Sequence, residues 1–66
     1  MEYSEEERHI AMAEALLGGF GRKSRRIRRL LRRAVRAREA GTRDMATENS
    51  LVDAVNVWTV RQVMES

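Results

Sequence analysis

Residues 24–40 carry eight arginines, the densest group of one chemical type in this 66-residue chain. A guanidinium group offers planar N–H donors that match phosphate and carboxylate oxygens, so such a run can bind a polyanion. No acidic residue interrupts the run before Glu39. Like charges three and four residues apart repel along a helix, and a bound anion relieves that cost. The run predicts a surface for nucleic acid or for an acidic protein, with a merely solvated helix face as the third interpretation.

Charge is unevenly distributed along the chain. Residues 22–43 hold eleven Lys and Arg against one acid, Glu39, a net of +10, while residues 1–21 sum to −4 and residues 44–66 to −3. A concentrated basic stripe is typical of a protein that binds the phosphate backbone. We therefore favour a small non-enzymatic regulator that binds nucleic acid, DNA or RNA; the alternative is an interaction module, an inhibitor or adaptor, docking on an acidic protein. The predicted nucleic-acid contacts are Arg22, Lys23, Arg25, Arg26, Arg28, Arg29, Arg32, Arg33 and Arg36.

Other chemistry is sparse. Glu6 and His9 have the Glu-x-x-His spacing that supplies ligands in di-metal helical bundles, but the chain has no second such pair, and a surface His is the simpler interpretation. With one His, no Cys and no Ser or Asp at relay spacing, the sequence lacks the parts of a hydrolase site. We expect no metal, no cofactor and no enzymatic activity.

The length allows one domain, residues 1–66, with a small core. Such a domain is marginally stable by itself, and without Cys it has no disulfide to support it, so self-association is the expected aid to folding. No apolar run approaches the roughly 20 residues of a membrane span, and the acidic start MEYSEEE does not resemble a secretory signal. We expect a soluble, cytoplasmic protein with no membrane partner.

Glycine and capping residues divide the chain into three helices, near residues 5–17, 24–40 and 47–64. Ser4 and Glu7 have capping-box spacing at the first, and the Gly18-Gly19 pair ends it. Ser24 is a plausible N-cap of the second, and Gly41 stands at its C-terminal cap. The apolar side predicted for the first helix comprises Ile10, Ala11, Ala13, Leu16 and Leu17, with Phe20 as a further candidate.

The second helix has one apolar stripe, made of Ile27, Leu30, Leu31, Ala34 and Val35. At roughly 100° per residue, the row Arg25, Arg29, Arg32 and Arg36 points directly away from this stripe. Arg38 falls on the apolar side instead. We expect it to reach past the helix end or to pair with a carboxylate such as Glu14 or Asp53.

The third helix has no clean polar side. Asp44 and Thr47 are both candidate N-caps, and Leu51, Ala54, Val55 and Trp58 share one helical face. We favour a helix throughout this segment. The β-branched stretch at residues 55–60 leaves an intermolecular strand as the alternative. Further apolar residues lie on the other faces, which favours a homo-oligomer formed through this helix. The predicted interface is Val52, Val57, Trp58, Val60 and Met64.

Overall fold

The computed structural model describes residues 2–65 and contains, in that range, helices and no strand. The helices are α1 (Glu5–Leu17), α2 (Phe20–Lys23), α3 (Arg25–Glu39) and α4 (Met45–Glu65). The predicted all-α fold of three long helices is confirmed, and α2 is an additional single turn. Residues 55–60 lie inside α4, so the strand alternative is wrong.

The helix ends follow from capping residues. Ser4 Oγ accepts a hydrogen bond from the Glu7 amide at 3.1 Å, and the Glu7 carboxylate accepts from the Ser4 amide at 3.2 Å, which completes the predicted capping box. At α4, Asp44 is the residue that caps: its carboxylate accepts from the Thr47 amide at 3.1 Å and from the Thr47 hydroxyl at 2.7 Å. Thr47, the other candidate cap, lies inside the helix and is buried.

Gly41 ends α3 in the left-handed conformation that the sequence predicted, with φ of 80°. The Gly41 amide donates to the Arg38 carbonyl and the Thr42 amide donates to the Ala37 carbonyl, the two hydrogen bonds of a Schellman motif. This motif turns the chain from α3 into the short connection before α4.

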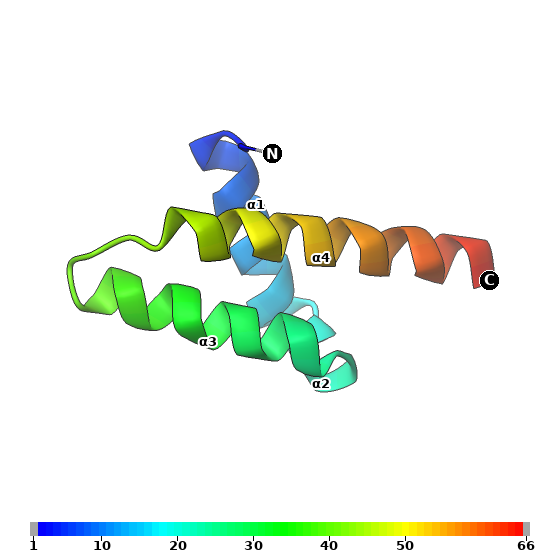
Figure 1. Cartoon of the computed structure of the whole chain (residues 1–66). Coiled ribbons are helices and arrows are strands. Elements are labelled where there is room, and N and C mark those ends of the chain that lie inside the picture. Colours follow the sequence, from blue (N-terminus) through cyan, green and yellow to red (C-terminus); the bar gives the residue numbers. More distant parts are fainter. Residues whose placement is uncertain (1, 66) are drawn as a thin grey trace.

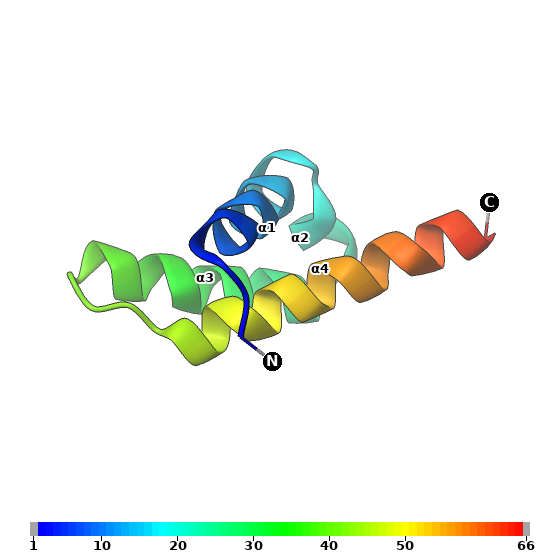
Figure 2. The ribbon, with the colours of Figure 1, turned by 90° about the horizontal axis from the view of Figure 1, so that it is seen from above.

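The chain is arranged as an antiparallel pair with a third helix across it. Helices α3 and α4 run side by side in opposite directions, and α1 crosses them, with α2 leading back from α1 to the start of α3 (Figures 1 and 2). The C-terminal end of α4 extends beyond the other helices. The last turns of α4 therefore project away from the other helices (Figures 1 and 2).

The core receives three apolar side chains from each long helix. α3 supplies residues of its predicted stripe, and α4 supplies part of its predicted face, with Ala54 and Trp58 partly buried against the core. The core residues are Ala11, Met12 and Ala15 of α1, Ile27, Leu31 and Ala34 of α3, and Leu51, Val52 and Val55 of α4.

The predicted apolar side of α1 is largely wrong. Ile10 and Leu16 are exposed, and Leu17 retains 88% of its surface, while Met12 is buried instead. The helix is rotated so that the small side chains of Ala11 and Ala15 meet the other helices, which lets the backbones approach closely. Arg8 lies on this same buried face, because its guanidinium reaches a carboxylate of α4.

Candidate nucleic-acid interface

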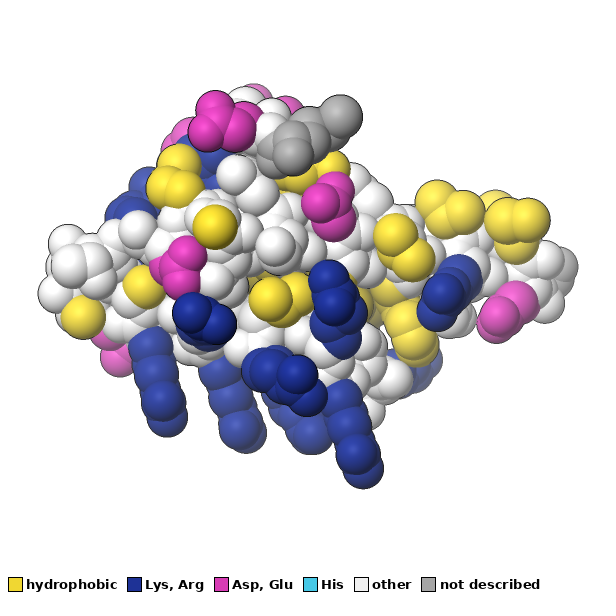
Figure 3. Space-filling model, viewed as in Figure 1, with side chains coloured by type: hydrophobic (Ala, Val, Ile, Leu, Met, Phe, Trp, Pro, Cys, Tyr) yellow, Lys and Arg dark blue, Asp and Glu magenta, His cyan; other side chains and the backbone are white. Residues whose placement is uncertain are grey.

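The outer face of α3 is positioned by its own apolar stripe. Ser24 caps the helix by accepting a hydrogen bond from the Ile27 amide at 3.2 Å. Ile27 and Ala34 are completely enclosed by the core, so the opposite side of the helix must face solvent. Figure 3 shows the result: a row of basic side chains projects from the α3 side of the molecule.

Every basic residue predicted to contact nucleic acid is exposed. Seven of these nine side chains lie on α3, and Arg22 and Lys23 extend the surface onto α2. We call these nine residues the basic face. Its members are Arg22, Lys23, Arg25, Arg26, Arg28, Arg29, Arg32, Arg33 and Arg36.

The basic face is almost free of compensating acids. Arg33 pairs with Asp44 at 3.4 Å, with its side chain largely exposed to solvent. Among residues 2–65, the other eight members make no ion pair. Arg25, Arg28, Arg29 and Arg32 line a shallow hollow of about 190 Å³ on this face. At 1.5 Å rise per residue, the row from Arg25 to Arg36 spans roughly 16 Å.

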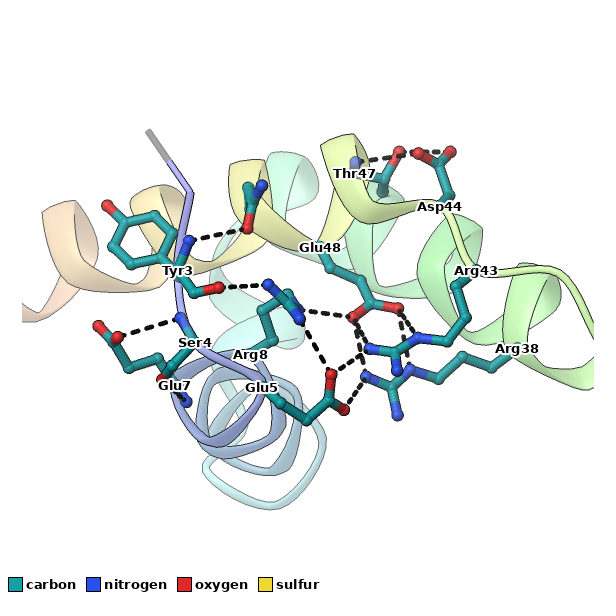
Figure 4. A network of polar contacts seen from close by, with 11 residues as sticks. Tyr3, Ser4, Glu5, Glu7, Arg8, Arg38, Arg43, Asp44, Thr47 and Glu48 are labelled. Atoms are coloured by element: carbon teal, nitrogen blue, oxygen red, sulfur yellow. Dashed lines mark hydrogen bonds and ion pairs between the residues drawn. The ribbon is translucent and has the colours of Figure 1, made fainter.

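The remaining arginines of this region have internal partners. Arg38 binds Glu48 through two hydrogen bonds, from Nε at 2.9 Å and from Nη2 at 2.8 Å, and Arg43 contacts the same carboxylate from Nη2 at 2.7 Å (Figure 4). Arg8 Nε lies 3.5 Å from Glu48 Oε1. The predicted partners of Arg38, Glu14 and Asp53, are therefore wrong, because Glu48 lies on the core-facing line of α4 opposite the end of α3.

Glu5 closes this network from α1. Its carboxylate accepts hydrogen bonds from Arg43 at 2.9 Å, from Arg8 at 3.0 Å and from Arg38 at 3.4 Å. Three helices and the α3–α4 connection thus meet through charge-assisted hydrogen bonds. We call Glu5, Arg8, Arg38, Arg43 and Glu48 the buried ion network after its two buried members, Arg8 and Glu48; the side chain of Glu5 is exposed.

The buried ion network changes the acidity of its carboxyl groups. Hydrogen bonding from Arg38 lowers the pKa of Glu48 to about 2, against the opposing effect of burial. Hydrogen bonding from Arg43, and then from Arg8, lowers the pKa of Glu5. Glu48 was missed as a structural residue although a signal exists: it precedes Leu51 by three residues and Val55 by seven, and so shares their face.

The five residues of the predicted oligomer interface differ in how far they are buried in the structure. Val52 is 4% exposed and belongs to the core of its own chain. Its burial therefore does not require a second copy of the chain, contrary to the prediction. Trp58 is partly buried against the same core and lines a hollow of about 260 Å³ between α3 and α4. Val57, Val60 and Met64 are exposed.

The Glu6 and His9 pair is not part of a larger site. Both residues are exposed on α1, and residues 2–65 contain no group of three or more potential ligands close enough to hold a metal ion. No helix in this range combines the length and the apolar character needed to cross a membrane. The cytoplasmic location stays a prediction.

Comparisons with known proteins identify no relative of this chain. No protein-family model, curated protein or solved structure matches the chain.

Proposed function

We propose that this protein is a non-enzymatic regulator that binds the phosphate backbone of nucleic acid through the basic face. The observation that carries the proposal is the separation of the arginines into two groups. Arg8, Arg38 and Arg43 are neutralised inside the buried ion network, whereas all of the basic face except Arg33 lacks an acidic partner within residues 2–65.

The electrostatics of α3 support an external anion. Arg25, Arg29 and Arg32 are spaced at i, i+4 and i+7, where like charges on a helix repel one another. The apolar stripe already fixes the helix, so this repulsion serves no purpose in folding. Phosphate groups remove the repulsion and release counterions, which supplies sequence-independent affinity.

An acidic protein surface is the alternative partner. The Arg33 contact with Asp44 demonstrates that a carboxylate can approach the edge of the basic face. Carboxylates and phosphates both fit the guanidinium fork, so the two partners must be separated by experiment.

The test replaces Arg25, Arg29, Arg32 and Arg36 together with Gln. Thermal stability should hold or rise, because Gln is a good helix former and repulsion is removed. The log–log salt dependence of duplex binding should become shallower by roughly 3 to 4 units per bound protomer, at about 0.9 per phosphate contact.

The matched control is Arg38→Gln, since Arg38 lies on the same helix but pairs with Glu48. It should lower stability and leave the salt slope nearly unchanged. If the wild-type protein binds neither DNA nor RNA at about 50 mM salt, the nucleic-acid proposal is wrong and the acidic protein partner replaces it.

We also propose that the protein self-associates through α4. Fewer residues support this proposal than the sequence predicted, because Val52 is a core residue and Trp58 is partly buried against the core. It rests on Val57, Val60 and Met64, which are 52%, 56% and 80% exposed on one helix. Apolar side chains grouped on a surface in this way are typical of an interaction site.

A further inference from the structure

The apolar side of α4 changes direction along the helix. Leu51, Val55 and Trp58 face the body of the molecule. Val57, Val60 and Met64 follow at i, i+3 and i+7. At roughly 100° per residue, Val60 and Met64 lie on the opposite side, and Val57 lies at the edge of that side, where it also lines the hollow between α3 and α4. We call these three residues the α4 ridge.

The core-facing line of α4 becomes polar where the body ends. After Trp58 it continues with Thr59 and Gln62, both exposed. Thr59 donates its hydroxyl to the Val55 carbonyl at 2.9 Å, which satisfies it within the helix. The projecting end of α4 (Figure 1) thus carries polar Thr59 and Gln62 on the line that continues the core face and apolar Val60 and Met64 on the other side. Val63, which is also exposed, lies between these two sides.

We infer that the α4 ridge packs antiparallel against the same ridge of a second copy of this chain. The inference rests on the proposed self-association and specifies its geometry. Val57, Val60 and Met64 occupy a, d and a positions of a heptad, the spacing of a helix–helix seam. Asp53, one d position earlier, ends the seam on one side, and Arg61 flanks it next to Val60.

The positions of Asp53 and Arg61 decide the orientation. A parallel pair in register would bring each d position against its copy, so Asp53 would meet the partner's Asp53 and be repelled. In the antiparallel pair each a position meets a d position, so Val57 packs on the partner's Val60 and Met64 on the partner's Asp53. Arg61 then lies three residues, or roughly 4.5 Å along the axis, from the partner's Asp53, within reach of its side chain.

Both charged groups are available for this contact. Arg61 is exposed and makes no ion pair within residues 2–65. Asp53 is also exposed and accepts a hydrogen bond from the Tyr3 hydroxyl through one oxygen, Oδ1. Its second carboxylate oxygen can accept from the Arg61 of a second copy, which gives two symmetry-related pairs per dimer.

The test is charge reversal measured by sedimentation equilibrium. Arg61→Asp and Asp53→Arg alone should each weaken the dimer by about tenfold or more, because both pairs become repulsive. The double variant Asp53→Arg with Arg61→Asp should recover most of the affinity, since the antiparallel pairs are restored with exchanged signs. Tyr3→Phe is the control that removes the hydroxyl contact to Asp53 without changing charge.

The outcomes separate the two proposals. A chain that stays monomeric to about millimolar concentration overturns both the self-association and its geometry. A dimer that is insensitive to the single reversals, or that the double variant does not rescue, overturns the antiparallel ridge alone. Neither result bears on the salt dependence of nucleic-acid binding.

Discussion

A single carboxylate, Glu48, connects the helices electrostatically at the scale of the residue. It is 1% exposed and is contacted by Arg8, Arg38 and Arg43, while Glu5 supplies the second negative charge. Removing one member of such a buried group leaves charges without partners, which costs more than the group contributes when complete. The stability of the chain should therefore depend on Glu48 far more than on its surface acids.

This dependence predicts a specific pH profile. The pKa of Glu48 is about 2 in the folded chain, below its ordinary value of 4.5, so its stabilisation is present above about pH 4.5 and is lost as pH falls toward 2. Glu48→Gln should lower the free energy of unfolding by about 3 kcal/mol at pH 7 and much less near pH 2. Urea denaturation followed by circular dichroism, from pH 7 to pH 2, measures both.

Glu39→Gln is the matched control, because Glu39 is exposed and makes no ion pair within the described residues. It should change the free energy of unfolding by less than about 0.5 kcal/mol at any of these pH values. Equal effects of the two substitutions at pH 7 would contradict the role given to Glu48.

At the scale of the element, the C-terminal cap of α3 fixes how this helix joins α4. Gly41 has φ of 80° and open space around the position of a Cβ atom, so a side chain there meets backbone strain and no steric clash. Gly41→Val should destabilise the chain by about 2 kcal/mol, Gly41→Ala by about 1, and Gly41→Asn by less than Gly41→Ala, because Asn tolerates the left-handed region. Thermal denaturation gives the ranking, and an Asn variant less stable than the Val variant would contradict the cap.

At the scale of the whole molecule, the apolar residues of α4 have two different structural roles. Val52 is enclosed by its own chain, whereas Val60 is exposed on the α4 ridge. Val52→Asp should unfold the protein, since a charge would be buried without a partner. Val60→Asp should leave a folded, helical monomer.

Light scattering together with circular dichroism distinguishes these outcomes. Gln62→Asp, on the exposed side opposite the ridge, is the control and should leave the dimer intact. A Val60→Asp protein with unchanged mass would show that the ridge is not the contact between copies.

The sequence by itself determined the three long helices and the basic face. Ser4, Ser24 and Gly41 act on backbone groups within one turn, so their effects could be predicted without knowledge of the rest of the chain. The stripe of Ile27, Leu31 and Ala34 is regular enough to fix which side of α3 is buried, and the arginines opposite are exposed as a consequence.

Only the tertiary structure decided which helical faces meet. Three features depend on where the helices cross and how closely they approach. These are the choice of which face of α1 is buried, the pairing of Arg38 with Glu48 and the burial of Val52. Periodicity in α1 and α4 admits more than one apolar side, because Ile10, Leu17, Val57 and Val60 repeat as regularly as the residues that are buried. The small side chains of α1 and the fit of three arginines around Glu48 select one arrangement, and these are properties of the packed helices together rather than of any one segment.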